Sequence, residues 1–131
     1  MSSRRVFQYR GFTLDELKQK SMDEFISLLP SRQRRSLTRG MSTQHIKLME
    51  RISASKDSKR PVRTHCRDFI ILPELIGAIV HVHNGREFLR VSLIPETLGH
   101  FLGEYAPTCK QVKHSAPGIG ATRGSQFVPL K

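Results

Sequence analysis

An asparagine–glycine pair, Asn84-Gly85, is the feature that most constrains the fold of this chain. Both central positions of a type I′ turn require a positive φ, which asparagine and glycine adopt more readily than other residues. The pair therefore favours this turn. Alternating apolar residues on either side predict two strands, residues 78–83 and 86–94. A two-residue loop would place Val82 opposite Glu87. The sequence therefore predicts an antiparallel hairpin at this point.

The two faces of this hairpin differ in character, because side chains alternate along a strand. One face is apolar and is expected to pack on a core, and it consists of Val80, Val82, Leu89, Val91 and Leu93. The other face is basic and partly aromatic and is expected to meet a partner, and it carries His81, His83, Arg86, Phe88, Arg90 and Ser92.

A helix is expected directly after the hairpin, with Pro95 in its first turn. Four apolar residues then follow at helical spacing, namely Leu98, Phe101, Leu102 and Tyr105. Gly99 and Gly103 fall within this stretch, although glycine weakens a helix by about 1 kcal/mol relative to alanine. Their presence predicts that another part of the backbone approaches closely here.

The charge of the chain indicates a nucleic-acid partner. Its 131 residues carry a net charge of +11, and the isoelectric point is near 10.5. Such an excess is the usual electrostatic footprint of a protein that binds phosphates. The apolar fraction of 37% predicts a small core. Two cysteines are too few for a disulfide framework, and no segment reads as a secretory leader or a membrane span.

The N-terminal part predicts several short helices. Capping boxes at Thr13–Glu16 and Ser21–Glu24 begin two of them. A basic helix over 31–40 follows Pro30, and no acid balances its arginines, which are Arg32, Arg34, Arg35 and Arg39. A further helix, capped by Ser42 or Thr43, is expected to run to about Ile52 with Ile46 and Met49 facing inward. Residues 53–60 read as a linker, 62–66 as a short strand, and 73–77 as one helical turn.

Both ends of the chain are basic. Aromatic and arginine residues alternate within 1–12, which suits either stacking on bases or anchoring an arm to the domain. Residues 106–131 contain three prolines, four lysines or arginines and no acid. This tail has little apolar surface, so we expect it to become ordered only against phosphates.

Candidate sites for chemistry are weak. His65, Cys66, Cys109 and His114 lack the spacing of a zinc site, so neither a metal nor another cofactor is expected. The glycines of 118–124 have the wrong spacing for a dinucleotide site, and no strand precedes them. His100 and Glu104 are expected to form a surface pair rather than a catalytic pair. The sequence therefore predicts no catalytic residue, with a free-standing RNA-processing enzyme or another RNA-binding protein as the alternative.

Several motifs together resemble the family of small-subunit ribosomal protein nineteen. They are Asn84-Gly85-Arg86, Leu93, Leu98-Gly99-His100, Leu102-Gly103-Glu104-Tyr105 and Thr108. The segments 31–40, 63–77 and 112–131 resemble the archaeal and eukaryotic branch of that family. Cys109 departs from the pattern, because the family usually has a basic residue after the threonine.

The resemblance implies an α+β fold, a small domain with a short, mainly antiparallel sheet backed by helices, N-terminal helices and an extended basic C-terminal tail. It divides the chain into a basic arm with short helices (1–60), a hairpin-and-helix core (61–105) and an RNA-binding tail (106–131). It implies a structural role in the head of the cytoplasmic small ribosomal subunit, against ribosomal RNA and beside small-subunit ribosomal protein thirteen and other head proteins. The tail is then expected to run toward the decoding region and the aminoacyl-site transfer RNA.

Thirteen residues are expected to contact RNA on the basis of charge and resemblance together, because phosphate contacts depend on basic side chains. They are Arg32, Arg34, Arg35, Arg39, Arg63, Arg67, Arg86, Arg90, Lys110, Lys113, His114, Arg123 and Lys131.

Overall fold

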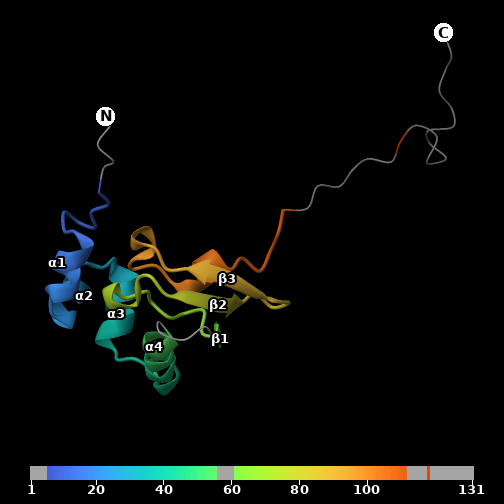
Figure 1. Ribbon diagram of the computed structural model, residues 1–131, viewed down its shortest axis with the longest axis horizontal. Coiled ribbons are helices and arrows are strands. Elements are labelled where there is room, and N and C mark those ends of the chain that lie inside the picture. The colour runs from blue at the N-terminus through green and yellow to red at the C-terminus, as the bar shows by residue number, and fades with distance from the viewer. Residues whose placement is uncertain (1–5, 56–60, 112–117, 119–131) are drawn as a thin grey trace, which may run out of the picture.

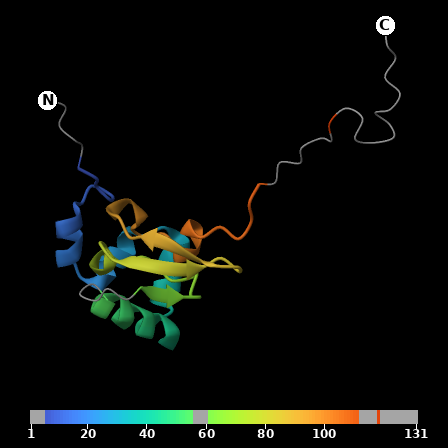
Figure 2. The same ribbon diagram turned by 45° about the vertical axis from the view of Figure 1, so that its right-hand side comes forward.

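The computed structural model describes residues 6–55, 61–111 and 118. Within them, helices and a three-stranded sheet form the α+β fold that the sequence predicts (Figures 1 and 2). In chain order the elements are α1 (Leu14–Gln19), α2 (Met22–Leu28), α3 (Ser31–Thr38), α4 (Thr43–Ser55), β1 (Val62–Thr64), η1 (Pro73–Leu75), β2 (Ile79–His83), β3 (Phe88–Ser92), η2 (Pro95–Thr97) and η3 (Leu102–Tyr105). The three η elements are 3₁₀ turns.

Side chains cap the first two helices, with the expected capping box at α1 and only its serine half at α2. The Thr13 backbone N–H donates to the Glu16 carboxylate at 2.7 Å, which is one half of a capping box. This bond holds the pKa of Glu16 below its ordinary value of 4.5, because it stabilises the charged form. The Ser21 hydroxyl accepts from the Glu24 backbone N–H at 3.3 Å. Local sequence therefore determines where α1 and α2 begin.

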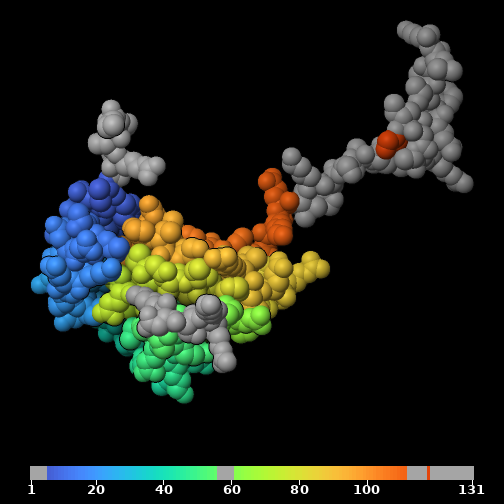
Figure 3. Space-filling view, viewed as in Figure 1, coloured from blue at the N-terminus to red at the C-terminus, as the bar shows by residue number. Residues whose placement is uncertain are grey.

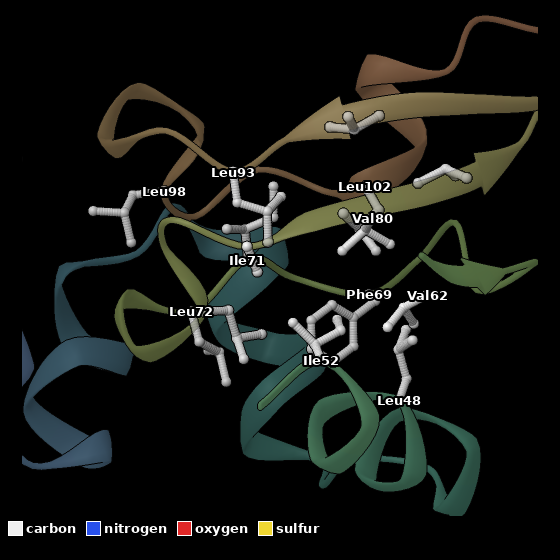
Figure 4. Close-up of a cluster of buried hydrophobic side chains, with 14 of the residues drawn as sticks. Leu48, Ile52, Val62, Phe69, Ile71, Leu72, Val80, Leu93, Leu98 and Leu102 are labelled. Carbon is white, nitrogen blue, oxygen red and sulfur yellow. The ribbon is translucent and has the colours of Figure 1, made fainter. Parts of the chain in front are cut away.

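The inward face of α4 differs from the expectation. Leu48 and Ile52 are fully buried, whereas Ile46 is 42% exposed and Met49 is half-buried. Figure 4 shows Leu48 and Ile52 pointing from α4 toward Val62 and Phe69. The helix is therefore rotated so that an i, i+4 pair meets the core, and Ile46 was wrongly placed there.

The sheet has the order β1-β2-β3 and is mixed rather than mainly antiparallel. β1 runs parallel to β2, with Val62 opposite Val80, and β2 runs antiparallel to β3. A parallel pair needs a long connection between its strands. Residues 65–78, including η1, supply that connection.

The hairpin has the expected faces but a different register. Val82 lies opposite Leu89 rather than Glu87, and Val80 lies opposite Val91. The loop therefore spans residues 84–87, and its Asn84 Oδ1 accepts from the backbone N–H groups of residues 86 and 87 at 2.9 and 2.8 Å. Gly85 is the only residue of this loop with a positive φ, and a type I′ turn needs two. The expected type I′ turn therefore does not form. The shift is two residues, and because the side-chain period is also two, the apolar face stays on the core.

The single helix expected from Pro95 to Tyr105 is absent. η2 ends at Thr97, an irregular segment follows, and η3 begins at Leu102. The segment around Phe101 instead pairs with the segment around Ile70, through bonds such as Ile71 N–H to His100 O at 3.0 Å. A helix and this extended pairing would both bring Leu98 and Leu102 into the core. The spacing of the apolar residues alone could therefore not distinguish the two conformations.

The close backbone approach predicted at the two glycines is confirmed at Gly103, whereas side chains crowd Gly99. A Cβ on Gly99 would lie 2.8 Å from Leu29 Cδ2 and 2.9 Å from the Tyr9 hydroxyl oxygen. A Cβ on Gly103 would lie 3.0 Å from both Cβ and the backbone oxygen of Arg67. These positions need glycine because neighbouring segments occupy the space of a side chain.

One hydrophobic core joins the helices to the sheet (Figure 4). Val80, Ile71 and Leu102 meet at its centre, and each is at most 1% exposed. Within the described part of the chain, every buried side-chain nitrogen or oxygen has a hydrogen-bond partner. The core is thus small, as the composition predicts, and it excludes unpaired polar groups.

The C-terminal tail begins one residue later than expected. Ala106 is fully buried in the core, whereas residues 107–111 are exposed and lead away from the body (Figure 3). The expectations for the linker at 56–60 and for most of the tail fall outside the described residues.

Candidate nucleic-acid interface

Three titratable or charged side chains lie in register across the outer face of the sheet. Arg63 of β1 is opposite His81 of β2, and His81 is opposite Arg90 of β3. Both arginines are exposed and the histidine is half-buried. Neighbouring strands are about 4.8 Å apart. Two arginines therefore flank one histidine along a row of backbone positions that crosses the three strands.

Aromatic rings form a second row beside the first. The ring centroids of His65 and His83 are 4.4 Å apart, and those of His83 and Phe88 are 4.9 Å apart. The guanidinium carbon of Arg63 lies 5.4 Å from the centroid of the Phe88 ring. His65 is exposed and the other two rings are half-buried, and accessible rings next to arginines are typical of surfaces on which bases stack. The expected basic and aromatic face is thus present, and it is extended by Arg63 of β1 and by His65, the residue after this strand.

The arginine helix α3 presents a second basic surface. Arg32, Arg35 and Arg39 line one wall of a groove between α3 and the segment 68–70. All three are exposed, and none of their side chains forms a hydrogen bond or an ion pair with another residue that the structure describes. Three arginines without an acidic partner favour an anionic ligand.

Arg34 has a different environment from the other arginines of α3. Its Nη2 donates to the backbone oxygens of Ser27 and Leu29 at 3.1 and 2.9 Å. These carbonyls lie at the C-terminal end of α2, where a helix leaves acceptors unpaired. Arg34 therefore joins α3 to α2, and an RNA contact by this residue stays a prediction.

Arg67 is also bound within the domain. Its Nη1 donates to His83 O at 2.6 Å, and its Nη2 donates to the oxygens of Gly103 and Ala106 at 2.9 and 2.6 Å. One half-buried guanidinium thereby connects the end of β2 to η3 and the start of the tail. An RNA contact by Arg67 likewise stays a prediction.

The remaining candidates lie at the edges of the described domain. Arg86 is exposed in the hairpin loop, and Lys110 is exposed beyond the buried Ala106. The other four candidates fall outside the described residues, and they are Lys113, His114, Arg123 and Lys131.

The histidines and acids of the described ranges form pairs rather than a metal-binding cluster. No group of three histidine, cysteine or acidic side chains there could hold a metal ion. The expected surface pair is confirmed, with His100 Nδ1 2.6 Å from Glu104 Oε2. Glu104 also accepts from the Phe101 backbone N–H at 3.1 Å, so it caps η3. Burial and the Glu104 charge raise the pKa of Tyr105 above its ordinary value of 10.0.

Sequence reasoning missed parts of both surfaces. It weighed His65 only as a metal ligand, although alternation after the buried Thr64 could have placed its ring on the outer face. It gave no role to Asp68 or His45 and placed Phe101 on an expected helical stripe, yet all three residues line the groove opposite α3. Asp68 and Phe101 lie in irregular segments, so no periodic pattern could have brought them together.

A small, strongly basic α+β domain with a basic and aromatic sheet face and an arginine-lined groove is characteristic of a nucleic-acid-binding protein. The model of the family Ribosomal protein S19 matches residues 35–114, and the chain belongs to this family. It is therefore a structural protein of the small ribosomal subunit that binds ribosomal RNA and acts in translation; the family is not one of enzymes.

The matched region begins inside α3 and includes the whole sheet, both 3₁₀ turns that follow it and the start of the tail. Both candidate surfaces thus lie largely within the part that defines the family. None of the helices in the described ranges has the length and apolar character needed to cross a membrane.

Proposed function

We propose that this chain occupies the head of the cytoplasmic small ribosomal subunit and represents the archaeal and eukaryotic form of its family. Its neighbours there are small-subunit ribosomal protein thirteen and other head proteins. The tail runs toward the decoding region, where it contacts the aminoacyl-site transfer RNA. The resemblance of segments 31–40 and 112–131 to that branch supports this assignment.

The ribosomal RNA binds across the outer face of the sheet in this proposal. The single observation that supports it most is the row Arg63–His81–Arg90, in which three strands present basic groups side by side. The phosphates of one RNA strand can follow such a row. The rings of His83 and Phe88 lie beside the row and can stack on bases. The hairpin loop extends the same surface with Arg86.

The exposed arginines of α3 form the second contact. Arg32, Arg35 and Arg39 carry three charges along one side of eight helical residues and the cap that follows. Guanidinium groups bind phosphate oxygens in bidentate fashion, so they also orient the domain on the RNA. Arg34 and Arg67 support these surfaces from within through their backbone bonds.

The test is the salt dependence of affinity for a ribosomal RNA fragment of the small-subunit head. Arg63→Gln and Arg90→Gln should each reduce the slope of log affinity against log salt by about 0.7–0.9 for each phosphate that is no longer bound. Lys18→Gln is the matched control, since Lys18 is exposed on α1, away from both surfaces. Unchanged slopes for both arginine variants would contradict an RNA contact at the sheet face.

A further inference from the structure

The groove between α3 and the segment 68–70 combines two kinds of surface. Its volume is about 850 Å³, within the range of sites that hold small ligands. One wall carries the guanidinium groups of Arg32, Arg35 and Arg39. The rest includes apolar side chains, among them the half-buried ring of Phe101. An occupant must therefore match cationic side chains and apolar side chains that include an aromatic ring.

The charge of the groove selects an anion. None of the three arginine side chains pairs with another described residue, and Asp68 is the only acidic side chain that lines the groove. Asp68 already lies 3.2 Å from His45, with its Oδ1 facing the imidazole Nε2. The arginine wall is thus left with its positive charge uncompensated.

A nucleotide meets both requirements in one molecule. Its phosphates suit guanidinium groups, and its base has a flat face that stacks on an aromatic ring. A base inside a duplex is covered on both faces by its neighbours, so only an unpaired base can enter. Phe101 offers such a ring beside the arginine wall.

We propose that this groove binds a single unpaired nucleotide of ribosomal RNA, and that guanine is the preferred base. The inference rests on the proposed function and adds to it the class of RNA that α3 recognises. The base stacks against Phe101, and the flanking phosphates bind Arg32, Arg35 and Arg39.

Asp68 provides the preference for guanine. Its side chain is 77% exposed, and a carboxylate can only accept hydrogen bonds. Guanine presents two adjacent N–H donors on its Watson–Crick edge, whereas the other bases place an acceptor next to each donor. Guanine therefore meets the carboxylate without an acceptor facing an acceptor. An acidic peptide segment is disfavoured, because its carboxylates would bind the arginines but its side chains offer no planar group with two adjacent N–H donors for Asp68.

The test uses the full chain and three short RNA hairpins of equal stem length. One hairpin is fully paired, one has a single bulged guanine, and one has a single bulged uracil. We expect the guanine bulge to bind roughly tenfold more tightly than the paired hairpin, which is in the range of stacking on one aromatic ring. Phe101→Leu should remove most of this preference. Asp68→Asn should keep the preference for a bulge and remove that for guanine, and this exposed site carries little risk to folding.

The controls separate this inference from the proposed function. Arg90→Gln lies on the sheet, so it should weaken all three hairpins alike and leave the guanine preference intact. Equal, salt-dependent binding of all three hairpins by the unaltered chain would overturn the nucleotide site and leave the proposed function standing. Absence of salt-dependent binding to any RNA would overturn both. Displacement of the guanine-bulged hairpin by a glutamate- and phenylalanine-rich peptide, abolished in Phe101→Leu, would show a protein-docking groove instead.

Discussion

Arg67 and Gly103 are hydrogen-bonded to each other in both directions. The Gly103 N–H donates to Arg67 O at 2.8 Å, and Arg67 Nη2 donates to Gly103 O at 2.9 Å. The glycine has no side chain, so the arginine backbone and side chain approach it together. The same guanidinium reaches the carbonyls of His83 and Ala106. This pair therefore connects the sheet, η3 and the start of the tail.

Replacing Arg67 should destabilise the domain rather than simply weaken RNA binding. Arg67→Met keeps much of the length of the side chain but leaves three carbonyl oxygens without their donors. We expect a loss of about 2–4 kcal/mol in the free energy of unfolding, because each carbonyl is only partly buried and so costs less than the upper end of the about 1–3 kcal/mol for a buried unsatisfied group. Equilibrium unfolding in urea measures this change in the free energy of unfolding.

Arg90→Met is the matched control for this substitution. Arg90 is exposed and its side chain makes no bond to the described residues, so its loss should change the free energy of unfolding by less than about 0.5 kcal/mol. Equal effects of the two substitutions would show that the Arg67 bonds contribute nothing specific.

The glycines provide a second prediction, on Gly99. A Cβ there meets Leu29 and Tyr9 below 3.0 Å, and φ is +73°, so Gly99→Ala combines overpacking with backbone strain. We expect a loss of about 2–4 kcal/mol in unfolding free energy from both effects together. Gly77→Ala has φ +95° and no atom within 4 Å, so thermal unfolding should show only the strain, about 1–2 kcal/mol. If the two variants were equally stable, the close packing at Gly99 would be refuted.

Local signals predicted much of the fold, but tertiary pairing overrode some of them. Capping residues marked the starts of α1 and α2, and alternation assigned the core side of Val80 and Val82. The turn at 84–87 could not be predicted from Asn84-Gly85. The Asn84 side chain accepts hydrogen bonds from the loop, and the backbone φ of Asn84 is not positive.

The sequence also predicted candidate arginines without distinguishing their roles. Arg34 and Arg35 are neighbours in a basic helix, yet Arg34 bonds to the end of α2 and Arg35 lines the groove. Charge counting treats both alike. Their difference depends on where α2 ends relative to α3 in space, which only the structure supplies.

The register of the hairpin gives a third prediction. Val80 lies opposite Val91 rather than Leu89, so the two valines should be energetically coupled. A double-mutant cycle of Val80→Ala and Val91→Ala should show a coupling of about 0.5–1 kcal/mol, as expected for contacting cross-strand pairs. Each single substitution should cost about 1–2 kcal/mol through reduced burial. The same cycle with Leu89→Ala should show a smaller coupling; the reverse order would restore the register expected from a two-residue loop.

The capping bond at α1 gives a fourth prediction, on pH. The pKa of Glu16 is lowered, chiefly by the Thr13 backbone N–H. A depressed pKa means that the stabilisation is complete above the unfolded value near 4.5 and is lost as pH falls through the folded value. Unfolding at a series of pH values should therefore show Glu16→Gln differing from the unaltered chain at neutral pH and converging with it in acid.

Thr13→Ala is the control for that experiment. It keeps the backbone donor and removes the side-chain bond, which is the second cause of the lowered pKa. NMR titration should then find the pKa of Glu16 still depressed, but by less than in the unaltered chain. A Glu16 pKa at its ordinary value in the unaltered chain would show that the capping bond does not form.

The boundary of the tail gives the last prediction, which concerns two truncations. Ala106 is fully buried, its N–H donates to Gly103 O at 3.3 Å, and its own carbonyl accepts from Arg67. A chain ending at Tyr105 loses these bonds and a core residue, so we expect about 1–3 kcal/mol less unfolding stability. A chain ending at Thr108 keeps them and removes only exposed residues from the described part, so its stability should be unchanged.

RNA binding should respond to the same truncations in a different way. Both shortened chains lack Lys110, Lys113, Arg123 and Lys131. Removing each phosphate-binding side chain should lower the slope of log affinity against log salt by about 0.7–0.9. The chain ending at Thr108 should therefore stay fully folded, while its slope of log affinity against log salt falls by the contribution of several phosphate contacts. If its stability fell as far as that of the chain ending at Tyr105, residues beyond Thr108 would belong to the folded domain rather than to an RNA-binding arm.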